Sequence, residues 1–128
     1  MFRTRFKNRS KIVEIGFGNG ELLSYVSKLG HQVVGVEINK DLVERAKKSN
    51  YMAYSGVIWK IPELQSEKFD LIVGTAVAEH IHYNDLVEFF SWANTHLNDN
   101  RHFIWYFLKR LRLLVWVIRM VILRIYYA

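Results

Sequence analysis

The chain has 128 residues, of which 51% are hydrophobic, enough for one domain with a core and too few for two. It contains no cysteine, which excludes disulfides and thiolate metal sites and gives no reason to expect secretion. We therefore expect a cytoplasmic protein and predict no metal site. The net charge is +6, but the basic residues gather at residues 1–11 and 101–128, where no acid occurs. Residues 12–100 are therefore mildly acidic, which argues against a nucleic acid-binding surface.

Short β-branched runs alternate with helical patterns along the chain. The predicted elements are strand 12–15, helix 21–29, strand 32–36, helix 40–48 capped by Asn39, weak strand 51–54, strand 69–74, helix 84–97 capped by Asn84, and strand 103–108. Glu44 and Lys48 are spaced for an i, i+4 pair. Short loops between strands and helices predict a Rossmann-like three-layer α/β/α sandwich with a mostly parallel sheet.

Three closely spaced glycines, Gly16, Gly18 and Gly20, stand between the first predicted strand and helix. Without side chains they allow a ligand to approach the backbone, and the helix start offers unpaired N–H groups. A nucleotide-like ligand suits such a loop. The dinucleotide fingerprint requires a glycine three residues after the second one, and position 21 is Glu. The spacing therefore disfavours NAD.

Glu37 ends the second predicted strand, 17 residues after Gly20. A carboxylate at that place can accept hydrogen bonds from the two vicinal hydroxyls of a ribose. A solvated loop carboxylate is the alternative interpretation of Glu37 alone. The glycine loop and the acid in this order favour an adenosine-type ligand.

The stretch from Glu14 to Gly20 reads Glu-Ile-Gly-Phe-Gly-Asn-Gly. It resembles the Glu-x-Gly-x-Gly-x-Gly loop of class I S-adenosylmethionine-dependent methyltransferases of small molecules. Residues 69–73 and 77–81 are similar to the family's fourth strand and the Glu-His-Ile turn after it. The resemblance covers about residues 11–98 and implies S-adenosyl-L-methionine as cofactor. It implies that Glu14, Gly16, Gly18 and Gly20 face the methionine part, that Glu37 faces the ribose, and that Thr75 to His80 face cofactor and substrate.

His80, beside Glu79, is the candidate catalytic residue, as a general base tuned by the neighbouring acid. The alternative is a histidine that only hydrogen-bonds backbone in the turn. Asp70 is either an active-site acid, as its place in the family implies, or an acid that organises a turn. Methyl transfer itself depends mostly on alignment of the reacting atoms, so no catalytic residue is strictly required.

Two features depart from the family pattern. Members carry an acid that binds the adenine amino group, and its place falls near Val57, yet no acid occurs between Glu44 and Glu63. The family sheet has seven strands, and only 20 residues follow Leu108. We therefore expect a sheet that lacks the last strands of the family.

The segment 109–128 is apolar but interrupted by basic residues. We predict a methyltransferase-like core over residues 1–108 and a basic apolar C-terminal helix over 109–128. The helix would pack on the sheet edge or a second subunit, lie on an anionic membrane as a peripheral contact, or stay disordered. It is too often interrupted for a membrane span.

These observations predict transfer of a methyl group from S-adenosylmethionine to a small-molecule or lipid-like acceptor. The alternative is a catalytically inactive methyltransferase-like fold that acts as a binding or membrane-associated module, because of the missing adenine acid. A nucleic acid methyltransferase ranks last, since only the basic ends support it.

Overall fold

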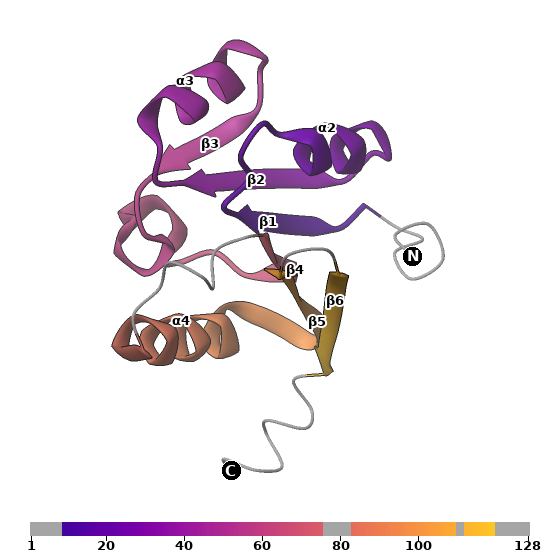
Figure 1. The fold of residues 1–128 in the computed structure, drawn as a ribbon, viewed down its shortest axis with the longest axis vertical. Helices are drawn as coiled ribbons and strands as arrows, with labels where there is room; N and C mark the ends of the chain where they lie inside the picture. The colour runs from indigo at the N-terminus through magenta and orange to yellow at the C-terminus, as the bar shows by residue number, and fades with distance from the viewer. Residues whose placement is uncertain (1–8, 76–82, 110–111, 120–128) are drawn as a thin grey trace.

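The computed structural model describes residues 9–75, 83–109 and 112–119. Its elements are β1 (Lys11–Ile15), α2 (Glu21–Lys28), β2 (Gln32–Glu37), α3 (Lys40–Lys48), β3 (Met52–Ser55), the 3₁₀ turns η1 (Ile58–Lys60) and η2 (Pro62–Leu64), β4 (Phe69–Thr75), α4 (Tyr83–His96), β5 (Leu97–Lys109) and β6 (Arg112–Arg119). The six strands form one sheet in the order β3-β2-β1-β4-β5-β6 (Figure 1). The mostly parallel α/β sheet predicted from the sequence is confirmed.

Strands β1 to β5 run parallel, so their carboxyl ends meet at one edge of the sheet. Central strand β1 pairs with β2 through Ile15 and Val36 and with β4 through Ile15 and Gly74. The segments that leave β1, β2 and β4 therefore start side by side. Ligands of open parallel sheets bind at this carboxyl edge, where the strand order reverses.

The sheet is covered on two faces because alternate residues of each strand point to opposite sides. Val13 and Ile15 of β1 join the core on the α4 side, whereas Ile12 packs with Val26 of α2 on the other. Figure 1 shows α2 and α3 on one side of the strands and α4 on the other. The three-layer arrangement follows directly from this alternation.

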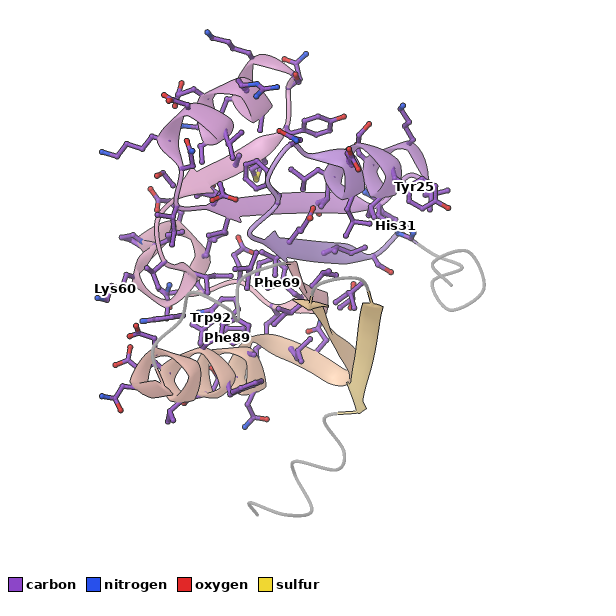
Figure 2. All side chains as sticks on the ribbon, viewed as in Figure 1. Tyr25, His31, Lys60, Phe69, Phe89 and Trp92 are labelled. Carbon is purple, nitrogen blue, oxygen red and sulfur yellow. The ribbon has the colours of Figure 1, made fainter. Side chains whose placement is uncertain are left out.

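Three large aromatic side chains fill the space between α4 and the sheet. Figure 2 shows Phe69, Phe89 and Trp92 gathered there, and the Phe69 and Trp92 ring centroids lie 6.1 Å apart. Phe69 is fully buried, and Phe89 is 1% exposed. Full burial of one such ring stabilises the fold by about 1.5–3 kcal/mol, so these rings fix α4 against the start of β4.

The sequence predicted a C-terminal helix over residues 109–128, and this prediction is wrong for the described residues of that segment. Residues 112–119 form strand β6, which pairs antiparallel with β5 from Lys109↔Arg112 to His102↔Arg119. The run Val115-Trp116-Val117-Ile118 consists of β-branched and aromatic residues, which favour a strand over a helix. Strand β6 thus extends the sheet of the core instead of forming a separate segment, and residues 120–128 lie outside the described part.

The predicted Asn39 cap is confirmed, whereas the predicted partner of Glu44 and the predicted start of α4 need correction. Asn39 caps α3, its Oδ1 accepting from the N–H groups of Asp41 and Leu42 as predicted. Glu44 forms its ion pair with Lys47, not Lys48. Helix α4 begins at Tyr83, one residue before the predicted cap. No helix among the described residues has the length and apolar character needed to cross a membrane.

Candidate cofactor site

The glycine loop joins β1 to α2 at the carboxyl edge of the sheet. Gly16, Gly18 and Gly20 have φ angles of 74°, 57° and 81°, in the left-handed region that other residues rarely adopt. Gly20 is the N-cap of α2, and no side chain caps that end. The first N–H groups of α2 therefore remain available to a ligand, as the sequence predicted.

Glu37 lies across from this loop at the end of β2. Its Oε2 accepts from the Gly18 N–H at 3.1 Å, and its Oε1 accepts from the N–H groups of Ile38 and Asn39 at 2.9 and 3.2 Å. Three backbone donors therefore fix the carboxylate against the glycine loop. Each carboxylate oxygen has two lone pairs. Oε1 already accepts two hydrogen bonds and Oε2 accepts one, so one lone pair on Oε2 remains for a ligand hydroxyl.

A second glycine turn lies beside Glu37 and was not singled out from the sequence. Gly56 has a φ of 127°, and its N–H donates to the Glu37 carbonyl oxygen at 3.1 Å. This contact ties the turn after β3 to the end of β2. A glycine directly after a short strand was the available sequence signal.

Gly35, inside β2, is another position that sequence reasoning missed. A Cβ there would lie 2.6 Å from Cδ1 of Phe17, the residue between Gly16 and Gly18. The bare backbone of β2 thus provides the space that the Phe17 ring occupies under the glycine loop. An isolated glycine in a strand pattern signals such a close approach.

Glu14 occupies a buried position in β1, next to Gly35 of β2 in register, and is 2% exposed. The carboxylate lies within the domain, two residues before the glycine loop. Its assignment to the methionine part of the cofactor stays a prediction.

The remaining predicted site residues are Thr75, at the end of β4, and His80, which follows it in the chain. Thr75 is the last residue of β4, one position after Gly74, which pairs with Ile15 at the start of the glycine loop. The backbone of Thr75 is thereby adjacent to the loop. His80 and its neighbours Glu79 and His82 lie outside the described residues.

Among the described residues, space for a ligand lies at the open edge beside Gly18. A Cβ added to Gly18 would meet no atom within 4 Å in the described part of the chain. A cavity of about 80 Å³ lies between the glycine loop and α3, bordered by Phe17, Arg45 and Tyr51. It is far smaller than the roughly 300 Å³ of the smallest usual ligand pockets, and Glu37 does not line it. We therefore place the candidate cofactor site on the open side of Gly18 and Glu37.

The region of the expected adenine acid contains apolar side chains. Val57 precedes η1, and Trp59 of η1 packs on the core, its ring centroid 6.3 Å from that of Phe89. Packing on the core therefore occupies part of the indole of Trp59. The backbone of the turn at Gly56 and Val57 is the part of this segment that lies beside Glu37.

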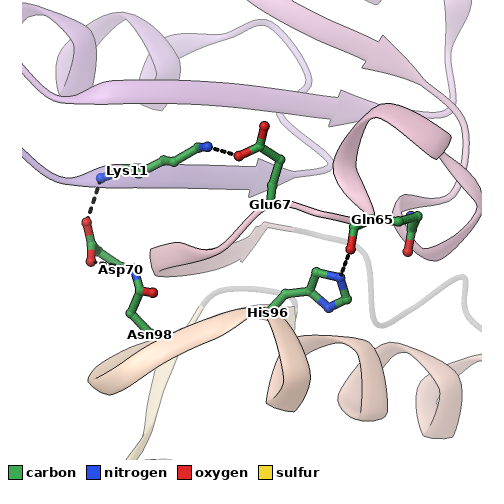
Figure 3. A network of polar contacts seen from close by, with 6 residues as sticks. All are labelled: Lys11, Gln65, Glu67, Asp70, His96 and Asn98. Carbon is green, nitrogen blue, oxygen red and sulfur yellow. Dashed lines mark hydrogen bonds and ion pairs between the residues drawn. The ribbon is translucent and has the colours of Figure 1, made fainter.

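Asp70 is not a residue of this site, contrary to the family expectation. It lies at the amino end of β4, one residue before Leu71, which pairs with Ile12 near the start of β1. Its Oδ2 accepts from the Lys11 N–H and its Oδ1 from Asn98 Nδ2, both at 2.9 Å (Figure 3). Asp70 joins the starts of three strands at the edge of the sheet opposite the glycine loop, so its role is structural.

The model of a methyltransferase domain family matches residues 1–124 of the chain. The chain belongs to this methyltransferase domain family. A curated relative, the ubiquinone biosynthesis O-methyltransferase of Pelagibacter ubique (strain HTCC1062), is 31% identical over 94 residues, which are 70% of this chain and 38% of the relative.

Solved structures share the fold. The PH0226 protein of Pyrococcus horikoshii OT3 is 25% identical with a TM-score of 0.70, over 83% of this chain and 52% of that one. A TehB-like S-adenosylmethionine-dependent methyltransferase of Corynebacterium glutamicum is 24% identical with a TM-score of 0.69, over 78% and 56%. The chain thus spans little more than half the length of these solved relatives and 38% of the curated one. The resemblance to Rossmann-like methyltransferases drawn from the sequence is confirmed for the family and the fold.

Proposed function

We propose that this methyltransferase-family chain binds S-adenosyl-L-methionine at the carboxyl edge of β1 and β2 and transfers its methyl group to an acceptor. One observation carries the proposal: the Glu37 carboxylate is held 3.1 Å from the Gly18 N–H, beside the open space over the loop. A ribose hydroxyl can donate to the remaining lone pair on Oε2 of that carboxylate. Gly16, Gly18 and Gly20 leave room for the rest of the cofactor.

Bound S-adenosylmethionine would supply an electrophilic methyl group on a sulfonium. The chain has to hold the acceptor in line with that group and exclude water, because alignment accounts for most of the rate increase. The acceptor oxygen would form the new O–C bond as the C–S bond of the sulfonium broke toward sulfur, and the chain would have to supply a base for the hydroxyl proton. His80, five residues after Thr75, is the proposed base, supported by its position in the sequence.

The proposed acceptor is a hydroxyl of a small or lipid-like molecule. The support is the name of the relative from Pelagibacter ubique, an O-methyltransferase of ubiquinone biosynthesis. The mildly acidic middle of the chain supports a small molecule over nucleic acid.

The second candidate function is an inactive member of the family that acts as a binding module. The observation that favours it is the absence of an acid between Glu44 and Glu63. Loss of one charge-assisted hydrogen bond to adenine costs about 1.5–3 kcal/mol, or one to two decades of affinity.

Calorimetric titration of the full chain with S-adenosylmethionine and S-adenosylhomocysteine tests the proposal. We expect micromolar binding that falls at least tenfold in Glu37→Gln, which keeps the size of the side chain and removes its charge. Glu44→Gln is the matched control, because Glu44 is an exposed acid of α3 that lies outside the site. Far-UV circular dichroism confirms that both variants fold.

A folded chain that binds neither compound contradicts the cofactor site. If binding occurs, methyl transfer to small hydroxylated acceptors is measured for the chain and for His80→Gln. Transfer that His80→Gln slows more at low pH than at high pH supports the base. Cofactor binding without any transfer across the acceptor set supports the binding module.

A further inference from the structure

We propose that Gln65 is a positioning residue for the cofactor: its side-chain amide fixes the turn after β3, and that turn faces the purine. The inference rests on the proposed function, because it concerns the same site. Gln65 is an exposed residue that follows η2 directly. Its hydrogen bonds connect η1 and η2 with α4, so a residue away from the site acts on the backbone beside it.

The side-chain amide of Gln65 closes the segment that contains η1 and η2. Its Nε2 donates to the Ile58 carbonyl oxygen at 2.8 Å and to the Ile61 carbonyl oxygen at 2.7 Å. The backbone bond from the Ile61 N–H to the same Ile58 oxygen is longer, at 3.4 Å. Hydrogen-bond geometry in short 3₁₀ turns is poor, so the amide of Gln65 is the closer partner of that oxygen.

One orientation of the amide satisfies all of these partners. The Trp92 Nε1–H can only donate, and it lies 3.1 Å from Gln65 Oε1. The carbonyl oxygens of Ile58 and Ile61 can only accept, so Nε2 has to face them. A flipped amide would set donor against donor and acceptor against acceptor. The contacts therefore determine both the place and the direction of the Gln65 amide.

Helix α4 fixes the backbone of Gln65 as well. His96 Nε2 donates to the Gln65 carbonyl oxygen at 2.9 Å (Figure 3), and the His96 ring stacks on Trp92 with a centroid distance of 4.2 Å. Lys68 Nζ donates to the Thr95 carbonyl oxygen at 3.0 Å. Trp92 is itself buried in the core. Gln65 is thus held by a helix that packs on the sheet.

The segment that Gln65 fixes begins beside the proposed ribose acid. Strand β3 is parallel to β2, with Ser55 in register with Glu37, so the turns after both strands start at the carboxyl edge. The Gly56 N–H donates to the Glu37 carbonyl oxygen at 3.1 Å. Ile58, two residues later, is 1% exposed and belongs to the core. The turn is therefore fixed at Gly56 by Glu37 and at Ile58 by Gln65.

The order of the strands places the purine over this turn. Strand β2 lies between β1 and β3 in the sheet. The purine and the methionine part are attached at opposite ends of the ribose. If Glu37 binds the ribose and the glycine loop after β1 binds the methionine part, the purine lies toward β3. A change in the turn after β3 would then reach the purine and leave the rest of the cofactor in place.

Calorimetric titration of the full chain with two ligands tests this role. S-adenosylhomocysteine carries the purine, and S-ribosylhomocysteine has the ribose and the homocysteine without it. Gln65→Glu keeps the size of the side chain but sets a carboxylate oxygen against the carbonyl oxygens of Ile58 and Ile61. We expect it to weaken binding of S-adenosylhomocysteine about tenfold and binding of S-ribosylhomocysteine at most about twofold.

Two matched variants separate the lost bonds from other effects of the substitution. Gln65→Met has the same length without donor or charge, and it should weaken binding of S-adenosylhomocysteine about fivefold. Gln32→Glu makes the same chemical change at an exposed residue at the start of β2, on the opposite edge of the sheet, and should leave both affinities unchanged. Far-UV circular dichroism establishes that each variant folds.

The outcomes distinguish this role from the proposed function. Equal losses for both ligands would show that Gln65 only supports the fold, and unchanged binding in Gln65→Glu and Gln65→Met would show that the turn does not need it. Either result overturns the positioning role and leaves cofactor binding intact. A folded unsubstituted chain that binds neither ligand contradicts the proposed function itself.

Hydrogen exchange measures the turn without any ligand. The Ile61 and Leu64 N–H groups donate to the Ile58 and Ile61 carbonyl oxygens, so these two amides report on η1 and η2. We expect them to exchange about fivefold faster in Gln65→Glu than in Gln32→Glu, because the loss of the amide bonds favours local opening. Equal exchange in the two variants would overturn the inference that Gln65 fixes this segment.

Discussion

The contact between Gly35 and the glycine loop makes a sharp prediction. Gly35 lies within β2, and a Cβ there would lie 2.6 Å from Cδ1 and 2.9 Å from Cε1 of Phe17, and 3.0 Å from Cδ1 of Leu23. Gly35→Ala therefore forces the Phe17 ring to move. Because Phe17 stands between Gly16 and Gly18, we expect the substitution to disturb both stability and the candidate cofactor site.

The size of the effect follows from the geometry. Carbon atoms in good contact lie about 3.5–4.0 Å apart, so the shortfall at Phe17 is about 1 Å. Phe17 is only 5% exposed and Leu23 is fully buried, so neither side chain can move without displacing its neighbours. Overpacking of this kind costs about 1–3 kcal/mol. We expect that loss in the free energy of unfolding and a weaker affinity for S-adenosylhomocysteine.

Urea unfolding followed by circular dichroism, together with calorimetric binding, measures both effects. Phe17→Ala removes Cδ1 and Cε1, the ring atoms that collide, so in that background Gly35→Ala should cost at least about 1 kcal/mol less than in the unsubstituted chain. The double-mutant cycle should then give a coupling energy of about 1 kcal/mol or more. A cost below about 0.5 kcal/mol for Gly35→Ala alone, or strict additivity in the cycle, would refute the steric reasoning.

Three other substitutions distinguish residues that stabilise the fold from residues of the candidate cofactor site. Asp70→Ala loses the bonds from Lys11 and Asn98 and should destabilise the fold by about 2 kcal/mol in urea unfolding; a changed cofactor affinity at intact stability would contradict its placement at the opposite edge. Asn39→Ala removes the cap of α3 and should cost about 1 kcal/mol, measured in the same way; no loss would mean that solvent replaces the cap. Gly18→Ala should lower the free energy of unfolding by about 1–2 kcal/mol, because alanine rarely adopts the positive φ of this position. It should also lower the affinity for S-adenosylhomocysteine at least tenfold, because the new methyl group enters the open space over the loop. An unchanged affinity would place the ligand elsewhere.

Local sequence patterns were enough to predict the first half of the fold and the place of the glycine loop. The predicted strand 12–15, the helix after Gly20 and the Asn39 cap all depend on residues close in the chain, so local patterns suffice. The order of glycine loop and strand-end acid likewise predicted that Glu37 would lie near the loop. Parallel strands bring successive carboxyl ends to one edge, which made that prediction a consequence of the fold class.

Roles that depend on partners distant in the chain became apparent from the three-dimensional arrangement of the strands. The place of Asp70 at the edge opposite the site follows from the register of β4 with β1, which no local pattern encodes. The close approach of Phe17 to Gly35 likewise requires two neighbouring strands in register. Residues 113–118 form an apolar run, and an apolar run is compatible with helix or strand until a partner is present. Pairing with β5 supplies that partner, because its backbone groups complete the hydrogen bonds that an isolated strand lacks.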